Sequence, residues 1–435
     1  MREHLKKARP RSRTPDEAVI RTVERILADV RAEGDRAVRR YSEQFDRWSP
    51  PSFRVEADAI RRIAAQLPES VKADVDFSRE QIAAFARRQR ETLAELEAET
   101  LPGVVLGHRL IPVASVGSYV PGGRYPLVAS ALMSIVTARV AGVRRVVACS
   151  PPAPGGEGIY PATLYAMASS GADEIYCLGG VQALAAMAYG TETIYSVDML
   201  VGPGNQFVAE AKRQLFGVVG IDLPAGPTEI LVIADETADP EVVAADLLGQ
   251  SEHGPTSWAV LVTTSRALGE AVIGEIARRL PTLPTAAVAG ESWDANGEVV
   301  VVATDEEAAA VADEYAPEHL EVQTRNPRWY LERLRNYGSL FLGEEATVAY
   351  SDKSVGTNHI LPTGRAARYT GGLWVGKFLK TVTYQWLTRE ASNRIAPVVG
   401  RVCHVEGMFA HEATAHLRLR KYGGEPGGTL PQPAG

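Results

Sequence analysis

Several residue types are scarce in this 435-residue chain, and each scarcity argues against a class of protein. The three cysteines, Cys149, Cys177 and Cys403, lie far apart and form no C-x-x-C pair, so neither a disulfide framework nor a thiolate zinc cluster is indicated. A reducing cytoplasm fits this pattern best. The longest apolar stretch, residues 126–137, is shorter than the roughly 20 residues that span a bilayer. We therefore expect a cytoplasmic protein without a membrane segment.

Positive charge is also in short supply. The chain has 46 Lys and Arg against 53 Asp and Glu, a net charge of −7, which disfavours nucleic acid as a partner. Basic residues are dense only in the first thirteen positions, where no apolar core follows, so a solvated arm is expected instead of a secretory signal. A polyanion-binding tail is the alternative. At roughly 150 residues per domain, the length predicts two or three domains.

The hydrophobic pattern divides the chain into helical ends and an alternating middle. A capping box of Thr14 and Glu17 around Pro15 predicts a first helix, and more helix is expected from Ala57 to Glu95. Short β-branched runs then alternate with helical stretches at 162–169, 181–189 and 205–215. The expected strands are 113–120, 146–149, 175–178 and 198–201, followed by 230–233, 259–263, 299–302, 320–323 and 340–342.

These two βαβ series predict an α/β fold, with two incomplete Rossmann-like doubly wound units and helical N- and C-terminal segments. We expect an N-terminal helical arm over residues 1–25. The first α/β domain is expected over 26–120 with 230–370, and the second over 121–229. Residues 371–435 are expected to be a C-terminal helical segment.

Two short motifs combine groups that can bind metal or transfer protons. Gln250 and His253 share one face at the end of a helix that begins at Asp239-Pro240, although Q-x-x-H alone favours an ordinary polar helix end. Glu318 and His319 lie where a predicted helix gives way to a strand. Both can take protons near neutral pH, so a general acid–base pair is one interpretation and an exposed turn the other.

The C-terminal third adds further candidates. Asp352 and His359 stand in one loop near a predicted strand end. Glu406 and His411 lie on a helical stretch with other histidines nearby, and spacing does not resolve which histidine matters. One thiolate-free ligand set suits catalytic zinc, although spacing alone does not justify it: Gln250, His253, Asp352 and His411.

Nucleotide motifs are weak. No G-x-G-x-x-G occurs, although Leu178–Gly180 and Gly202–Asn205 both follow predicted strands and open helices, where backbone amides can hold phosphates. Gly371–Lys377 has phosphate-loop spacing, but Phe378 stands where Ser or Thr is needed for magnesium. We therefore do not expect a nucleotide triphosphate.

Six segments occur in the order seen in histidinol dehydrogenases, and from about residue 15 to 422 the chain resembles that family. They are Tyr119–Gly123, Gly202–Asn205, Ala225–Glu229, Gln250–Pro255, Pro317–His319 and Gly356–His359. The resemblance implies an enzyme with one Zn²⁺ per subunit that oxidises a primary alcohol through an aldehyde to a carboxylate, using two NAD in turn.

The resemblance also implies roles for individual residues. Glu318 and His319 match the catalytic acid–base pair. The matched metal ligands are Gln250, His253, Asp352 and His411, with His411 donated across a homodimer by the C-terminal segment. The matched NAD contacts are Tyr119, Gln182 and Asn205, on the side of the second α/β domain, and the matched substrate contacts are Thr228, His359 and Glu406.

Two segments depart from the biosynthetic members and look like the branch that includes sulfopropanediol 3-dehydrogenase. Arg124-Tyr125 and residues 367–377 replace smaller side chains, and Arg124 and Arg368 are expected to contact an anionic substrate. The favoured substrate is therefore a small anionic polyol such as 2,3-dihydroxypropane-1-sulfonate. The alternatives are histidinol, in L-histidine biosynthesis, a zinc hydrolase with Glu318 as base, and a catalytically silent binding protein.

Overall fold

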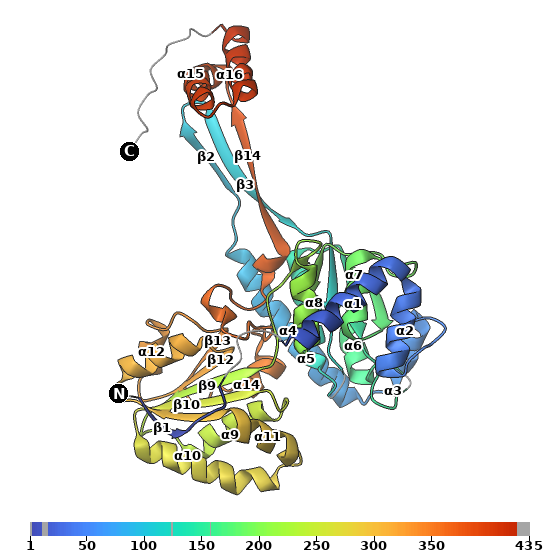
Figure 1. Cartoon of the computed structure of the whole chain (residues 1–435), viewed down its shortest axis with the longest axis vertical. Coiled ribbons are helices and arrows are strands. Elements are labelled where there is room, and N and C mark those ends of the chain that lie inside the picture. The colour runs from blue at the N-terminus through green and yellow to red at the C-terminus, as the bar shows by residue number, and fades with distance from the viewer. Residues whose placement is uncertain (1, 11–15, 123–124, 157, 424–435) are drawn as a thin grey trace. The chain divides into compact units, whose positions relative to one another are not determined.

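A computed structural model gives the fold of residues 2–10, 16–122, 125–156 and 158–423 (Figure 1). The chain forms two compact units. The first comprises Met1–Arg90 and Val113–Phe378, and the second comprises Glu91–Pro112 and Leu379–Gly435. Among the described residues, no helix is long and apolar enough to cross a membrane.

One parallel sheet of the first unit has the strand order β6-β5-β4-β7-β8. Its strands are β4 (Ser115–Tyr119), β5 (Arg145–Ser150), β6 (Glu174–Cys177), β7 (Met199–Val201) and β8 (Gly220–Ile221). The connecting helices are α5 (Val128–Ala141), α6 (Pro161–Ser169), α7 (Gly180–Tyr189) and α8 (Gln206–Leu215). The chain reverses its winding between β4 and β7, and ligands bind at such points in open α/β sheets.

The other sheet of this unit has the order β1-β11-β10-β9-β12-β13, with only the edge strand β1 antiparallel. Its strands are β1 (Glu3–Lys6), β9 (Glu229–Ala234), β10 (Trp258–Thr263), β11 (Gly297–Val301), β12 (His319–Gln323) and β13 (Ser339–Leu342). Figure 1 shows α9 (Pro240–Ser251), α10 (Arg266–Arg279) and α11 (Ala286–Asn296) on one face and α12 (Asp305–Tyr315) on the other. Both faces are therefore covered, as continuous apolar strands require.

The N-terminal part differs from the expected arm. Strand β1 pairs with β11, so residues 3–6 are part of a sheet. Helix α1 (Glu17–Glu33) is capped by Asp16, which accepts the Ala18 N–H at 2.8 Å, while Thr14 lies outside the described residues. Further helices are α2 (Asp35–Asp46), α3 (Ala57–Gln66) and α4 (Glu69–Glu91).

The expected domain boundaries also differ from the packing. Val23 and Ile26 of α1 and Val38 of α2 share one buried core with α7 and α8 of the five-stranded sheet. The sequence prediction instead groups residues 26–120 with 230–370. The packing differs because the apolar stripe of α1 is covered by α7 and α8, which come more than 140 residues later in the chain.

The second unit contains a three-stranded antiparallel sheet, in the order β14-β3-β2, and two helices. Its elements are β2 (Leu96–Leu101), β3 (Val104–Pro112), β14 (Leu379–Leu387), α15 (Arg389–Val405) and α16 (Phe409–Lys421). The prediction that residues 371–435 are helical was wrong for β14. That strand is exposed along most of its length, so it lacks the apolar pattern by which a strand is recognised.

Short elements complete the first unit. They are α13 (Pro327–Leu331), α14 (Val348–Tyr350), a π-helical segment (Ser351–Val355) and 3-10 turns at Leu280–Thr282, Ala366–Arg368 and Val375–Phe378. Gly356 ends the π-helical segment at φ 115°, and a Cβ there would lie 2.7 Å from the Gln81 carbonyl oxygen. Glycine is therefore required where the Asp352 loop turns toward His359.

Candidate active site

A cavity of about 890 Å³ within the first unit brings together most of the predicted site residues. Predicted residues that line it are Tyr119, Gln182, Asn205, Thr228, Gln250, His253, Glu318, His319, Asp352 and His359. Both sheets contribute to its wall. Glu318 and His319 come from the beginning of β12, beside β9, whereas Tyr119 comes from the end of β4 and Asn205 from the turn that follows β7.

Glu318 enters the cavity because α12 ends abruptly. Ala316 adopts a left-handed conformation with φ 48°, and its N–H still donates to the Ala312 carbonyl at 2.8 Å. An alanine in this conformation is strained by roughly 1 kcal/mol, so the surrounding packing must hold it there. The turn places Glu318 and His319 at the very start of β12, beside β9.

The Glu318 carboxyl is buried and asymmetrically bonded. Its Oε2 accepts the Glu229 N–H at 2.9 Å and the Thr228 hydroxyl. Burial raises the pKa of Glu318 well above its usual range, the Thr228 hydrogen bond opposes that shift, and the charge of Asp352 adds to it. Because Oε2 already accepts two donors, Oε1 is the atom that takes up or releases a proton.

His319 and His359 form a linked imidazole pair. His319 Nδ1 lies 2.9 Å from the Glu229 carbonyl oxygen, which only accepts, so Nδ1 carries the proton. Burial lowers the pKa of His319 well below 6.5 and that of His359 to about 4, so both rings are neutral. His319 Nε2 is then a lone pair that accepts the His359 Nδ1–H at 3.3 Å.

This tautomer assignment leaves one basic atom without a protein partner. His359 Nε2 is buried and makes no hydrogen bond within the described chain. As Nδ1 holds the ring proton, Nε2 is an acceptor on the cavity wall. A ligand with a hydroxyl or amine donor would satisfy it.

Thr228 connects Glu318 to Gln250. The Thr228 hydroxyl has one hydrogen, which it donates to Glu318, and it accepts from the Gln250 side-chain amide. The amide nitrogen of Gln250 is therefore committed to Thr228. Its carbonyl oxygen remains as the atom available to a ligand, which is the atom that a metal ion needs.

The predicted metal ligands are only partly gathered in one chain. Gln250, His253 and Asp352 line the cavity, whereas His411 lies on α16 in the second unit, where it is exposed. Within the described part of the chain, no group of three or more His, Cys, Asp or Glu side chains is placed to hold a metal ion. An amide oxygen, an imidazole and a carboxylate are three of the four ligands that such a zinc site would need.

Asp352 carries its charge despite its surroundings. Burial opposes its ionisation, but the opposing effects, of which the charge of Lys353 is the largest, hold the pKa of Asp352 below its ordinary value. Lys353 forms an ion pair with Asp352 and also lines the cavity. It is the one Lys or Arg on the cavity wall among the residues that the structure describes.

The remaining predicted contacts are Arg368, Glu406 and Arg124. Arg368 is exposed on a 3-10 turn, where its Nε donates to the Arg365 carbonyl at 3.3 Å, and it is absent from the cavity wall. Glu406 follows α15 in the second unit and is exposed. Arg124 lies outside the described residues. Lys353 was missed by sequence reasoning because one lysine beside a candidate carboxylate reads as a simple surface pair.

The predicted NAD contacts meet at the ends of β4, β6 and β7. The buried Tyr119 hydroxyl accepts the Gly180 N–H at 3.2 Å, and burial raises the pKa of Tyr119 to about 12. Gln182 is 1% exposed and donates from Nε2 to Asp46 at 3.3 Å. Asn205 caps α8 by accepting the Phe207 and Val208 N–H groups, so its side chain fixes this helix end.

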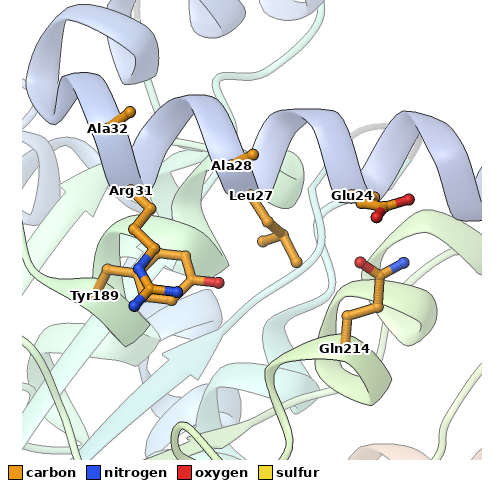
Figure 2. Close-up of a pocket in the computed structure, with 7 residues that line it drawn as sticks. All are labelled: Glu24, Leu27, Ala28, Arg31, Ala32, Tyr189 and Gln214. Carbon is orange, nitrogen blue, oxygen red and sulfur yellow. The ribbon is translucent and has the colours of Figure 1, made fainter.

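A second cavity, of about 360 Å³, lies along α1 and contains none of the predicted site residues (Figure 2). It is lined by Glu24, Leu27, Ala28, Arg31, Ala32, Tyr189 and Gln214. Arg31 lies over the Tyr189 ring, with its guanidinium carbon 5.6 Å from the ring centre. Its lining mixes apolar, charged and amide side chains, as the surface of an ordinary helix does.

Known proteins are similar to this chain over nearly its whole length. Residues 9–419 match the family model for histidinol dehydrogenase. A histidinol dehydrogenase homolog from Shouchella clausii is 56% identical, over 97% of this chain and 100% of that protein. The chain belongs to the histidinol dehydrogenase family.

Two further relatives bear on substrate and fold. The sulfopropanediol 3-dehydrogenase of Ruegeria pomeroyi is 49% identical over 97% of each chain. The crystal structure of histidinol dehydrogenase from Elizabethkingia anophelis is 34% identical, with a TM-score of 0.89 over 96% of this chain and 95% of that one. The mixed α/β fold is therefore the histidinol dehydrogenase fold, and the chain is an oxidoreductase of a family of NAD-dependent four-electron dehydrogenases.

Proposed function

We propose that this protein is a zinc-dependent, NAD-linked dehydrogenase that oxidises a small anionic primary alcohol through an aldehyde to a carboxylate, such as 2,3-dihydroxypropane-1-sulfonate. One observation carries the proposal. The acid–base pair Glu318 and His319 shares a single cavity with three candidate metal ligands and with three candidate NAD contacts. The five-stranded sheet would be the Rossmann-like NAD side, in keeping with the reversal of winding between β4 and β7.

The candidate ligands support one zinc per subunit. The Gln250 carbonyl oxygen, the His253 imidazole and the Asp352 carboxylate would hold the ion, and His411 would come from the second protomer of a homodimer. When bound there, zinc would supply positive charge that orients and acidifies the substrate hydroxyl. The hydrogen bond from the Gln250 side-chain nitrogen to Thr228 supports this assignment, because it leaves the Gln250 carbonyl oxygen available to the ion.

We assign the alcohol proton to the imidazole pair. His319 Nδ1–H is held by the Glu229 carbonyl, and His319 Nε2 accepts the His359 Nδ1–H, so His359 Nε2 is the basic atom that is left without a partner. The pair would therefore accept the hydroxyl proton of the alcohol, and NAD, when bound, would supply the oxidant that takes the hydride. Because both rings are neutral before the reaction, the base is in its active form at neutral pH.

Glu318 would act in the second oxidation. Its raised pKa makes it a stronger base than an exposed glutamate, and its Oε1 is free of the two hydrogen bonds that engage Oε2. We assign to Glu318 the removal of a proton from water as that water adds to the aldehyde. A second NAD, when bound, would supply the oxidant that converts the resulting hydrate to the carboxylate. Retaining the aldehyde in one enclosed site prevents its loss.

Lys353 supports an anionic substrate. It is a cation on a wall that otherwise presents neutral and acidic groups within the described chain, and it lies beside the proposed metal site. An ammonium there suits a sulfonate, phosphate or carboxylate better than a cationic amine. Histidinol is the second candidate, favoured by the name and fold of the relatives at 56% and 34% identity.

Substrate preference is tested with the purified zinc-loaded enzyme. We expect NADH formation with 2,3-dihydroxypropane-1-sulfonate to exceed that with histidinol by at least about tenfold in kcat/KM, a difference of about 1.4 kcal/mol. Two NADH should form per carboxylate produced, as measured by mass spectrometry. His319→Asn is the matched control, since it keeps the shape of the site and removes the base. Faster turnover of histidinol would assign the enzyme to histidine biosynthesis, and hydrolysis without NAD would overturn the proposal.

A further inference from the structure

Asp46 is a carboxylate on the cavity wall to which neither the sequence nor the proposed mechanism gives a role. It is the last residue of α2, which ends because Arg47 adopts a left-handed conformation with φ 50°. Asp46 Oδ2 accepts the Gln182 Nε2 at 3.3 Å, beside the start of α7. A Cβ on Gly179 would lie 3.4 Å from the same oxygen, so the backbone approaches Asp46 closely there.

The surroundings of Asp46 leave acceptors without donors. The Gln182 side chain is 1% exposed, and its Oε1 has no hydrogen-bond partner within the described chain. Within the same residues, no lysine, arginine or histidine forms an ion pair with Asp46, and burial raises the pKa of Asp46 to about 6. Both residues line the cavity, and at pH 8 they hold a charged carboxylate beside a neutral amide oxygen that has no partner within the described chain.

This chemistry selects a ligand with two neighbouring donors. A ribose diol supplies two hydroxyl hydrogens at the spacing of adjacent carbons, one for each acceptor. A phosphate on one of those hydroxyls supplies only acceptors and brings up to two negative charges toward the Asp46 carboxylate. In a partly desolvated wall that repulsion is stronger than in water.

The elements around Asp46 indicate which end of a dinucleotide lies here. Asp46 lies beside the start of α7, which follows β6 of the five-stranded sheet. Glu318 and His319 lie instead at the start of β12, in the six-stranded sheet. The nicotinamide must lie beside the acid–base pair for hydride transfer. Asp46 is therefore placed toward the adenosine half.

We propose that Asp46 and Gln182 bind the adenosine ribose diol of NAD and that Asp46 excludes the 2′-phosphate of NADP. The inference rests on the proposed function in one respect, that a nicotinamide dinucleotide occupies this cavity. Asp46 is then the residue that sets cofactor specificity, although it takes no part in the chemistry.

The test is direct binding without alcohol. Calorimetry of the zinc-loaded wild-type enzyme with NAD or NADP is expected to show at least about tenfold tighter binding of NAD. Asp46→Asn removes the charge but keeps the shape, and should bring the two dissociation constants within about threefold. Asp46→Ser, which is smaller, should do the same by admitting the phosphate. Glu43→Gln, on the exposed face of α2, is the matched control and should leave the ratio unchanged.

The outcomes separate this inference from the proposed function. Equal binding of NAD and NADP by the wild type, or an unchanged ratio in both folded Asp46 variants, would overturn the role of Asp46 while leaving the dehydrogenase assignment in place. Failure of the wild type to bind either nucleotide would overturn both. A fall in the NAD preference of Asp46→Asn, with the KM for the alcohol unchanged, supports the inference.

Discussion

His319 Nε2 lies 3.3 Å from His359 Nδ1, and this contact joins two neutral imidazoles into one proton acceptor. The far nitrogen of His319 is fixed by the Glu229 carbonyl at 2.9 Å, so the polarity of the pair is determined from one end. Phe341 packs against both rings, with ring centres 6.1 Å and 5.6 Å away. The pair is therefore oriented by β9, β12 and β13 together.

The burial of His359 predicts a loss of stability in acid. The pKa of His359 is about 4 in the folded protein and about 6.5 in the unfolded chain. As the pH falls, the unfolded chain takes up the proton first. The stability contributed by the neutral ring is thus fully present above about pH 6.5 and is lost as the pH falls toward 4. At pH 5 the loss is about 2 kcal/mol.

His359→Gln isolates this contribution, because glutamine cannot titrate. We expect the wild type to lose about 2 kcal/mol more than the variant between pH 8 and pH 5, as measured by urea denaturation of metal-free protein. His404→Gln is the control, since His404 is exposed on α15. If the free energy of unfolding fell equally with pH in the wild type and in His359→Gln, the buried ring would not be neutral.

Glu318→Gln should separate the two oxidations. The amide cannot remove a proton from water, so hydration and oxidation of the aldehyde should slow by a factor of about 10² to 10⁴, the usual contribution of a general base. Oxidation of the alcohol should slow much less, because the His319–His359 pair takes that proton. Stopped-flow NADH formation from the alcohol and from the corresponding aldehyde measures the two steps. Equal slowing of both would remove Glu318 from its role with water.

The proposed homodimer predicts rescue between two inactive variants. His253→Ala and His411→Ala should each lose zinc by elemental analysis, because each removes one ligand, and His416→Ala should retain it. If His411 comes from the partner, a mixed dimer has one intact site. Random reassembly of the two inactive chains should then restore about a quarter of wild-type activity and zinc content. Loss of zinc in His416→Ala alone would identify the wrong histidine, and no rescue would place His411 in the same chain.

Much of the fold was predictable because parallel strands are recognisable. The nine predicted strands, from β4 to β7 and from β9 to β13, lie within about two residues of their observed bounds. Their apolar runs are buried on both faces, so local sequence and tertiary position agree. Strand β2 has the sequence LEAETL, which is rich in helix formers, and only pairing with β3 makes it a strand.

The motifs of the candidate site could be recognised in the sequence, but the hydrogen bonds between its residues could not. Residues such as Glu318 and His359 stand in short distinctive segments, whereas Asp46 ends an ordinary amphipathic helix. Its position beside Gln182 depends on packing between residues 136 positions apart. Sequence spacing carries no information about such a contact. The hydroxyl of Thr228, which connects Gln250 to Glu318, was hidden for the same reason.

A buried ion pair beside the turn at Gly202–Asn205 gives a prediction about stability. Lys212 and Asp222 are 1% and 0% exposed, and they pair directly. Lys212 donates to the Gly202 carbonyl at 2.9 Å, and Asp222 accepts the Gly202 N–H at 2.8 Å. Gly202 itself has φ 120°, and a Cβ there would lie 2.1 Å from the Tyr119 carbonyl oxygen. The pair therefore fixes the turn that leads to Asn205.

Lys212→Met leaves the Asp222 carboxylate buried without its counter-charge, and should lower the free energy of unfolding by about 3–5 kcal/mol. Lys212→Met/Asp222→Asn removes both charges and keeps an amide for the Gly202 backbone, so it should recover at least half of that loss. Urea denaturation measures both, and Arg21→Met, in an exposed pair with Glu17, is the control that should change little. The KM for NAD should rise in the single variant, because the turn to Asn205 loosens. A double variant as unstable as the single one would show that hydrogen bonding, and not charge balance, holds this turn.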